Sequence, residues 1–130
     1  MTDFSDSLRL SVSGMRAQAM RLRLLSENIA NTDTPGYRRK TVTFEQAAGA
    51  ERTGGEVRTG RVKLDRSELP QIHDPAHPLA DASGHYAGSN VDLVIEIADS
   101  REAQRSYEAN LKLFDQARQM SQALRELLRR

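Results

Sequence analysis

Histidines and aspartates gather in one stretch of the sequence, and these residue types could bind a metal. The stretch contains His73, Asp74, His77, Asp81 and His85. Neutral imidazoles and carboxylates are ligands of zinc and iron. However, Pro75 and Pro78 stiffen a non-helical backbone here, so the ligands share no helix face, and no second cluster supplies more of them. We therefore interpret the stretch as an extended segment fixed against neighbouring structure, and we expect no metal and no other cofactor.

A basic run, Arg38-Arg39-Lys40, follows Tyr37 and could contact phosphates. The run is short, and the formal net charge of the whole chain is only +1. A nucleic-acid-binding protein normally carries a wider basic surface than this. We therefore expect no nucleic-acid partner, and we expect these side chains to pair with acidic groups between subunits.

No catalytic pattern can be identified in the sequence. The chain has no Cys, which excludes disulfides and thiolate catalysis. The spacing of its Ser, Asp and His residues matches no nucleophile elbow, and we find neither a glycine-rich phosphate loop nor paired catalytic carboxylates. The sequence therefore predicts a protein that is not an enzyme.

The composition is weak for a domain with a large core. Hydrophobic residues make up 38% of the 130 residues, aromatic residues make up 5%, and there is no Trp. Much of the apolar surface must therefore lie in narrow stripes. The chain opens with Asp3 and Asp6 instead of a basic region before an apolar run, and no stretch approaches about 20 apolar residues. We expect neither a cleaved secretion signal nor direct insertion into a membrane.

The apolar pattern predicts a long helix near each end of the chain. From Asp3 to Ala30, apolar residues recur at alternating steps of three and four, as in a coiled-coil seam. Gly14 in this helix predicts a close helix–helix approach or a bend. The helical pattern returns from Val91 to the last residue, and the residues expected to form packing or assembly surfaces are Leu8, Val12, Met15, Leu22, Ile29, Leu93, Ile97, Tyr107, Leu111, Phe114, Leu124 and Leu128.

The residues between the two helices predict a thin insert. Pro35-Gly36 suits a type II turn, residues 37–44 favour a short strand, and residues 45–69 favour at most short exposed hairpin strands. Residues 70–90 contain three prolines and are expected to be an extended tether. We predict a mainly α fold, in which the helices pack as an antiparallel coiled-coil-like pair joined by a small, partly β or irregular middle segment. The expected divisions are 1–36, 37–90 and 91–130.

Two motifs resemble the flagellar axial proteins, the family of rod, hook and hook–filament junction subunits. The first motif comprises Asn28, Ile29, Ala30, Asn31, Thr34, Pro35, Gly36, Tyr37, Arg38 and Arg39. The second resembles the FlgC family of proximal rod proteins, and it comprises Asp74, Pro75, His77, Pro78, Asn90, Val91, Asp92, Ser106, Tyr107, Glu108, Ala109 and Asn110. The compact Thr34-Pro35-Gly36 also resembles the sister family FlgB.

This resemblance implies a structural subunit that polymerises through its terminal helices into the torque-transmitting proximal rod. The implied partners are copies of itself, the rod proteins FlgB, FlgF, FliE and FlgG, and the flagellar type III export apparatus. The implied location is the rod in the periplasm, reached without cleavage of a signal. From periodicity alone, a soluble helical hairpin acting as a cytoplasmic adaptor is equally compatible, because a pattern does not say which chain supplies the covering helix.

Overall fold

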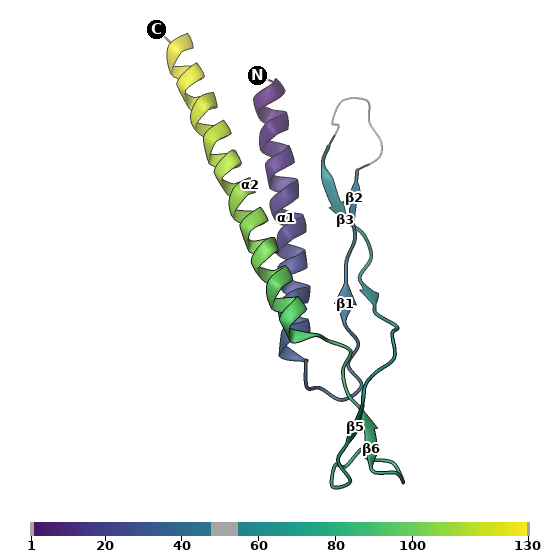
Figure 1. Cartoon of the computed structure of the whole chain (residues 1–130). Coiled ribbons are helices and arrows are strands. Elements are labelled where there is room, and N and C mark those ends of the chain that lie inside the picture. Colours follow the sequence, from purple (N-terminus) through teal and green to yellow (C-terminus); the bar gives the residue numbers. More distant parts are fainter. Residues whose placement is uncertain (1, 48–54, 130) are drawn as a thin grey trace.

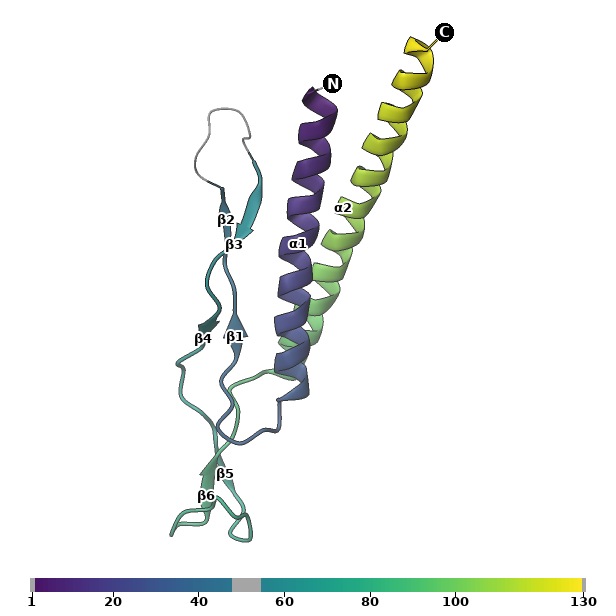
Figure 2. The ribbon, with the colours of Figure 1, turned by 180° about the vertical axis from the view of Figure 1, so that it is seen from behind.

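The computed structural model describes residues 2–47 and 55–129. Two long helices, α1 (Thr2–Ala30) and α2 (Leu93–Leu128), run antiparallel, and α1 lies between α2 and the strands (Figures 1 and 2). The predicted mainly α fold is therefore confirmed. Neither described helix contains the long apolar stretch that a membrane span requires.

Local signals explain where the helices end and begin. After α1, the backbone N–H of Tyr37 donates to the carbonyl of Thr34 at 3.1 Å, and Gly36 has a positive φ of 72°, as the third position of a type II turn requires. Asp92 caps α2, because its carboxylate accepts hydrogen bonds from the backbone N–H groups of Val94 and Ile95. The turn agrees with the sequence prediction at Pro35-Gly36.

Polar and small residues take part in the contact between the helices, which we call the seam. A Cβ atom added to Gly14 would lie 2.8 Å from Asn110 Oδ1, so this glycine does permit a close approach. Ala103 and Ala117 of α2 are buried at seam spacing. The polar contacts that cross the seam join Arg21 to Asp99 and Glu102, and Asn28 to Glu96.

The large apolar residues of the predicted seam are at most half-buried. On α1, Leu8, Val12, Met15, Leu22 and Ile29 are only half-buried. The seam positions Gly14, Arg21 and Asn28 each come one residue before Met15, Leu22 or Ile29. Neighbouring residues of a helix point about 100° apart, so the two sets face different directions. On α2, Tyr107 and Phe114 are half-buried, whereas Leu93, Ile97, Leu111, Leu124 and Leu128 are exposed. These exposed residues are not buried between α1 and α2, and their role in an assembly surface stays a prediction.

The middle segment forms three two-stranded antiparallel ribbons. Strands β1 (Lys40–Thr41) and β4 (Lys63–Leu64) pair beside α1, and β2 (Phe44–Gln46) pairs with β3 (Val57–Thr59) further along the same helix. The third ribbon, β5 (Gln71–His73) with β6 (His85–Ala87), projects beyond the base of the helix pair. Part of the predicted tether is therefore a hairpin. Of the weakly specified region 45–69, residues 48–54 lie outside the described residues.

The core of this fold is small. Among the described residues, the buried hydrophobic side chains are Ala17, Leu24, Leu25, Ala103 and Ala117. Asn28 and Glu96 have the largest of the fully buried side chains. Polar contacts therefore hold together the place where the helices meet the middle segment.

Candidate functional site

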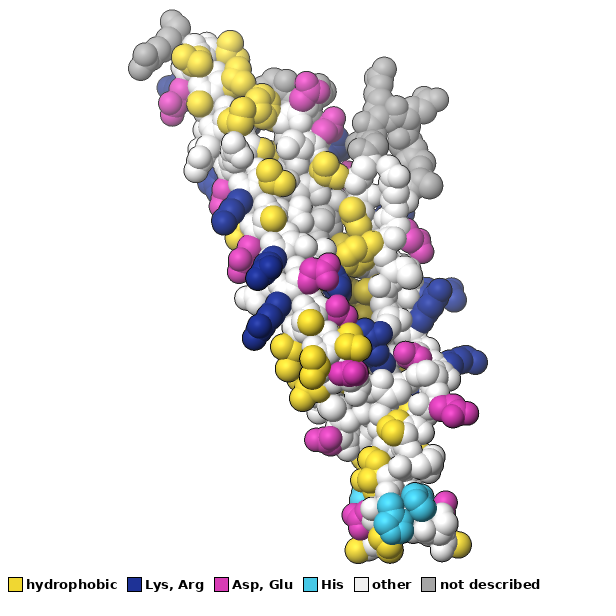
Figure 3. Space-filling model, viewed as in Figure 1, with side chains coloured by type: hydrophobic (Ala, Val, Ile, Leu, Met, Phe, Trp, Pro, Cys, Tyr) yellow, Lys and Arg dark blue, Asp and Glu magenta, His cyan; other side chains and the backbone are white. Residues whose placement is uncertain are grey.

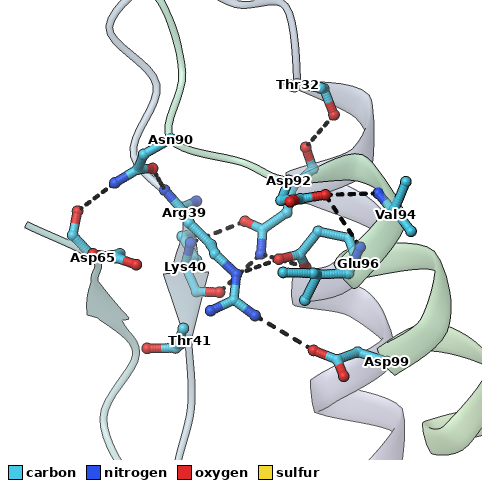
Figure 4. Close-up of polar contacts among 12 residues, drawn as sticks. Thr32, Arg39, Lys40, Thr41, Asp65, Asn90, Asp92, Val94, Glu96 and Asp99 are labelled. Carbon is cyan, nitrogen blue, oxygen red and sulfur yellow. Dashed lines mark hydrogen bonds and ion pairs between the residues drawn. The ribbon is translucent and has the colours of Figure 1, made fainter. Parts of the chain in front are cut away.

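Residues of the first motif and of the start of α2 meet at the base of the helix pair (Figure 4). We call this group the polar junction; it comprises Asn28, Tyr37, Arg39, Lys40, Asn90, Glu96 and Asp99. Its members come from α1, from the segment after the turn, from the segment before α2, and from the first turns of α2. The junction therefore joins the first motif to the segment that leads into α2, whereas the motif residues of the β5–β6 ribbon and residues 106–110 of α2 lie outside it.

Asn28 uses its whole side-chain amide at this junction. Its Nδ2 donates to the Lys40 carbonyl at 2.9 Å and to Glu96 Oε2 at 3.1 Å. Its Oδ1 accepts from the Lys40 backbone N–H and from the Tyr37 hydroxyl, both at 2.9 Å. The side chain is 1% exposed, so these bonds are shielded from water. Asn28 thus fixes the start of β1 against α1.

Glu96 is the only fully buried carboxylate among the described residues, and its exposed fraction is 0%. Besides the amide of Asn28, it accepts a hydrogen bond from Arg39 Nε. The Arg39 guanidinium also reaches Asp99 Oδ2 at 3.4 Å. Because a buried carboxylate without partners is unfavourable, Arg39 and Asn28 are the groups that make this position tolerable.

Asn90 fixes the approach to α2. Its Oδ1 accepts from the Arg39 backbone N–H at 2.6 Å, and its Nδ2 donates to the Asp65 carbonyl at 2.9 Å. Nearby, the Ser89 hydroxyl donates to the Thr32 carbonyl. These bonds tie the end of the middle segment to the turn after α1, so both helices leave the junction from a common framework.

The charged groups at the edge of the junction shift one another's pKa values. The Lys40 ammonium, 2.9 Å from Glu27, lowers the pKa of that carboxyl, and Glu27 raises the pKa of Lys40 in return. Partial burial raises the pKa of the Tyr37 phenol, which keeps it available as a donor to Asn28. These shifts are those of a structural ion-pair network, and none points to a proton-transfer group.

The basic run is occupied by contacts within the chain. Arg38 donates to the carbonyls of Asp65 and Ser67, Arg39 pairs with Glu96, and Lys40 pairs with Glu27. The expectation that these residues also pair with acidic groups between subunits stays a prediction. All three cations already have acceptors inside the molecule.

The histidines lie at the β5–β6 ribbon. The rings of His73 and His85 lie 4.7 Å apart between centroids, and the His77 ring stacks on Tyr86 at 3.9 Å. Asp81 accepts hydrogen bonds from the backbone and hydroxyl of Ser83, and Asp74 accepts from the backbone of Ala76. Within the described part of the chain, no group of three His, Asp or Glu residues could hold a metal ion.

The remaining motif residues are divided between the seam and the surface. Asn110 faces Gly14 and its amide donates to the Ser106 carbonyl, whereas Glu108 and Ala109 are exposed. Sequence reasoning missed Glu96, although one signal was available. A single acidic residue stands within Leu93-Val94-Ile95-Glu96-Ile97, and such a residue either faces water alone or is buried with a partner.

Exposed apolar side chains gather near both ends of α2, with basic side chains between them (Figure 3). At its start, Leu93, Val94, Ile95 and Ile97 surround the buried Glu96, and Val94 is 76% exposed. Further along, the exposed residues are Leu111, Leu113, Met120, Leu124, Leu127 and Leu128. This apolar surface has no cover within the described chain.

Two family models match the sequence. The model described as flagella basal body rod protein matches residues 8–38. The model described as flagellar basal body rod FlgEFG protein C-terminal matches residues 82–127. The matches therefore include most of both helices and, of the polar junction, Asn28, Tyr37, Asn90, Glu96 and Asp99.

Similar proteins cover nearly the whole chain. The flagellar basal-body rod protein FlgC of Agrobacterium fabrum is 41% identical, over 99% of this chain and 98% of the relative. FlgC of Salmonella typhimurium is 35% identical over 83% and 85%, and FlgC of Bacillus subtilis is 32% identical over 92% and 94%. Each of these relatives is a FlgC protein, as the second motif predicted, and the chain belongs to the FlgC family of flagellar basal-body rod proteins.

Proposed function

We propose that this chain is a structural subunit of the flagellar basal-body rod, and that it assembles with copies of itself and with other rod subunits through the outer faces of α1 and α2. The observation that carries this proposal is the exposed apolar surface of α2. In the first turn of that helix, Leu93, Val94 and Ile95 are exposed apolar residues. The one charged residue of this turn, Glu96, is buried against Asn28. A helix turn that is apolar on its outer sides is normally covered by another element.

The proposed role includes no catalysis. Residues 1–36 and 91–130 form the assembling core in this proposal, and residues 37–90 form an insert beside it. The proposed neighbours are FlgB, FlgF, FliE and FlgG, and the proposed route is the type III export apparatus, without signal cleavage, to the rod in the periplasm. The resemblance to rod proteins supports these assignments.

Substitutions on the exposed face test the proposal without disturbing the fold of the isolated chain. Val94→Asp and Leu127→Asp place a charge on side chains that are already largely exposed, so the purified variants should unfold at nearly the wild-type temperature. In the rod, the same charge would be buried without a partner. We expect both variants to abolish swimming and to be missing from isolated basal bodies.

Gln104→Asp and Gln119→Asp are matched controls, because they add the same charge to exposed polar positions of the same helix. We expect both control variants to swim. Normal swimming and normal rod content for Val94→Asp and Leu127→Asp would contradict the proposed role of this face. Absence of the wild-type chain from basal bodies would contradict the proposed function itself.

A further inference from the structure

The seam repeats with equal spacing on both helices. The separation from Gly14 to Asn28 equals the separation from Glu96 to Asn110, and Arg21 and Ala103 lie at the two midpoints. Gly14 meets Asn110, Asn28 meets Glu96, and the acidic partners of Arg21, Asp99 and Glu102, lie within one turn before Ala103. The seam is thus a heptad repeat in one antiparallel register.

A heptad seam of leucines would leave this register poorly defined. Leucine layers that slide by one heptad meet equivalent leucine layers, so the packing changes little. A polar residue at a seam position fixes register and orientation at some expense of stability. In this chain the positions Gly14, Arg21 and Asn28, one heptad apart, are polar or small, and the buried Leu24 and Leu25 come between Arg21 and Asn28 in the chain.

We propose that Asn28, Arg39 and Glu96 are the residues that determine the register of the α1–α2 pair. A slip of one heptad moves α2 by about 10 Å along α1. The Glu96 carboxylate would then leave both the amide of Asn28 and the guanidinium of Arg39, and it would be left without a partner. The slipped state is therefore disfavoured by the junction.

Arg39 strengthens this restriction because it lies outside the helices. Its backbone N–H is held by Asn90, two residues before the Asp92 cap of α2. Its position is therefore set by the segments that enter and leave the helix pair. The register in turn sets the heights at which the apolar faces of α1 and α2 are presented, and only this consequence rests on the proposed function.

Disulfide trapping in the purified full-length chain tests the register, since the chain has no Cys. Arg21→Cys with Ala103→Cys reports the observed register. Arg21→Cys with Asn110→Cys and Ser7→Cys with Asn110→Cys report a slip of one heptad in either direction. In the wild-type background only the first pair should close within a monomer, because the others are about 10 Å out of level, beyond disulfide reach.

The decisive background carries Asn28→Leu, Arg39→Leu and Glu96→Leu, which replaces the polar contacts by apolar ones. We expect this variant to remain helical by circular dichroism, and we expect the yield of the slipped disulfides to rise about tenfold relative to the wild-type background. The matched control carries Asn31→Leu, Arg38→Leu and Glu108→Leu. This control changes the same residue types outside the seam, so its slipped disulfides should stay at the wild-type level.

Two results would overturn the proposal. The first is a helical leucine variant whose slipped disulfides stay at the wild-type level. If that variant does not fold, Arg39→Met with Glu96→Leu, which keeps Asn28, is judged by the same criterion. The second is loss of helix in both variants, because the three residues would then be required for folding itself and not for the choice of register. Neither result depends on whether the chain builds a rod.

Discussion

Replacing Asn28 by alanine should be one of the most destabilising single changes in this chain. The side chain makes four hydrogen bonds, two to the Lys40 backbone, one to the Tyr37 hydroxyl and one to Glu96. A hydrogen bond contributes about 1 kcal/mol net, and a buried group that loses its partner costs about 1–3 kcal/mol. Because Glu96 keeps Arg39, and Tyr37 is only partly buried, we expect Asn28→Ala to lower the free energy of unfolding by roughly 3–5 kcal/mol.

The assay is urea unfolding of the purified chain, followed by circular dichroism. Asn31→Ala is the matched control, because its amide makes one short-range bond, to the Glu27 carbonyl at 2.8 Å, and one to the Thr34 hydroxyl. That change should cost about 1 kcal/mol. If Asn28→Ala also costs only about 1 kcal/mol, the four bonds do not stabilise the junction as we argue, and water must replace them.

Three other changes probe separate parts of the fold. Gly14→Val should lower the free energy of unfolding by about 1–3 kcal/mol, and Asn110→Ala should restore it, because the added Cβ meets the Asn110 side chain; failure of the rescue would place the strain elsewhere. Because the pKa of Glu27 is lowered, its bond to Lys40 stabilises the protein above about pH 4.5, and this stabilisation is lost as the pH falls through the folded-state pKa. Glu27→Gln should therefore make the unfolding midpoint less sensitive to acid. An unchanged dependence of the midpoint on acidic pH would contradict this. Replacing the three histidines by Gln should leave rod content nearly normal, and the wild type should bind no stoichiometric metal. Asp74→Ala with Pro75→Gly should reduce rod content more. A larger loss of rods in the histidine variant would contradict a positioning role for this segment.

The sequence determined the two helices of this fold and the turn after the first, but not the β5–β6 hairpin. The helices follow from periodic apolar residues, the turn follows from Pro35-Gly36, and the start of α2 follows from the Asp92 cap. Each of these signals acts within a few residues, so each is readable without knowledge of the rest of the molecule. The two motifs also identified the family.

Only the tertiary structure decided which face of each helix meets the other. The apolar repeat through Met15, Leu22 and Ile29 is the stronger sequence signal, but the helices meet along Gly14, Arg21 and Asn28. Apolar periodicity identifies a face that needs cover without identifying what covers it, whereas the value of a polar residue depends on partners that lie far away in the chain. Glu96 shows this most clearly, because burial of its carboxylate became favourable only when Arg39 and Asn28 were brought to it.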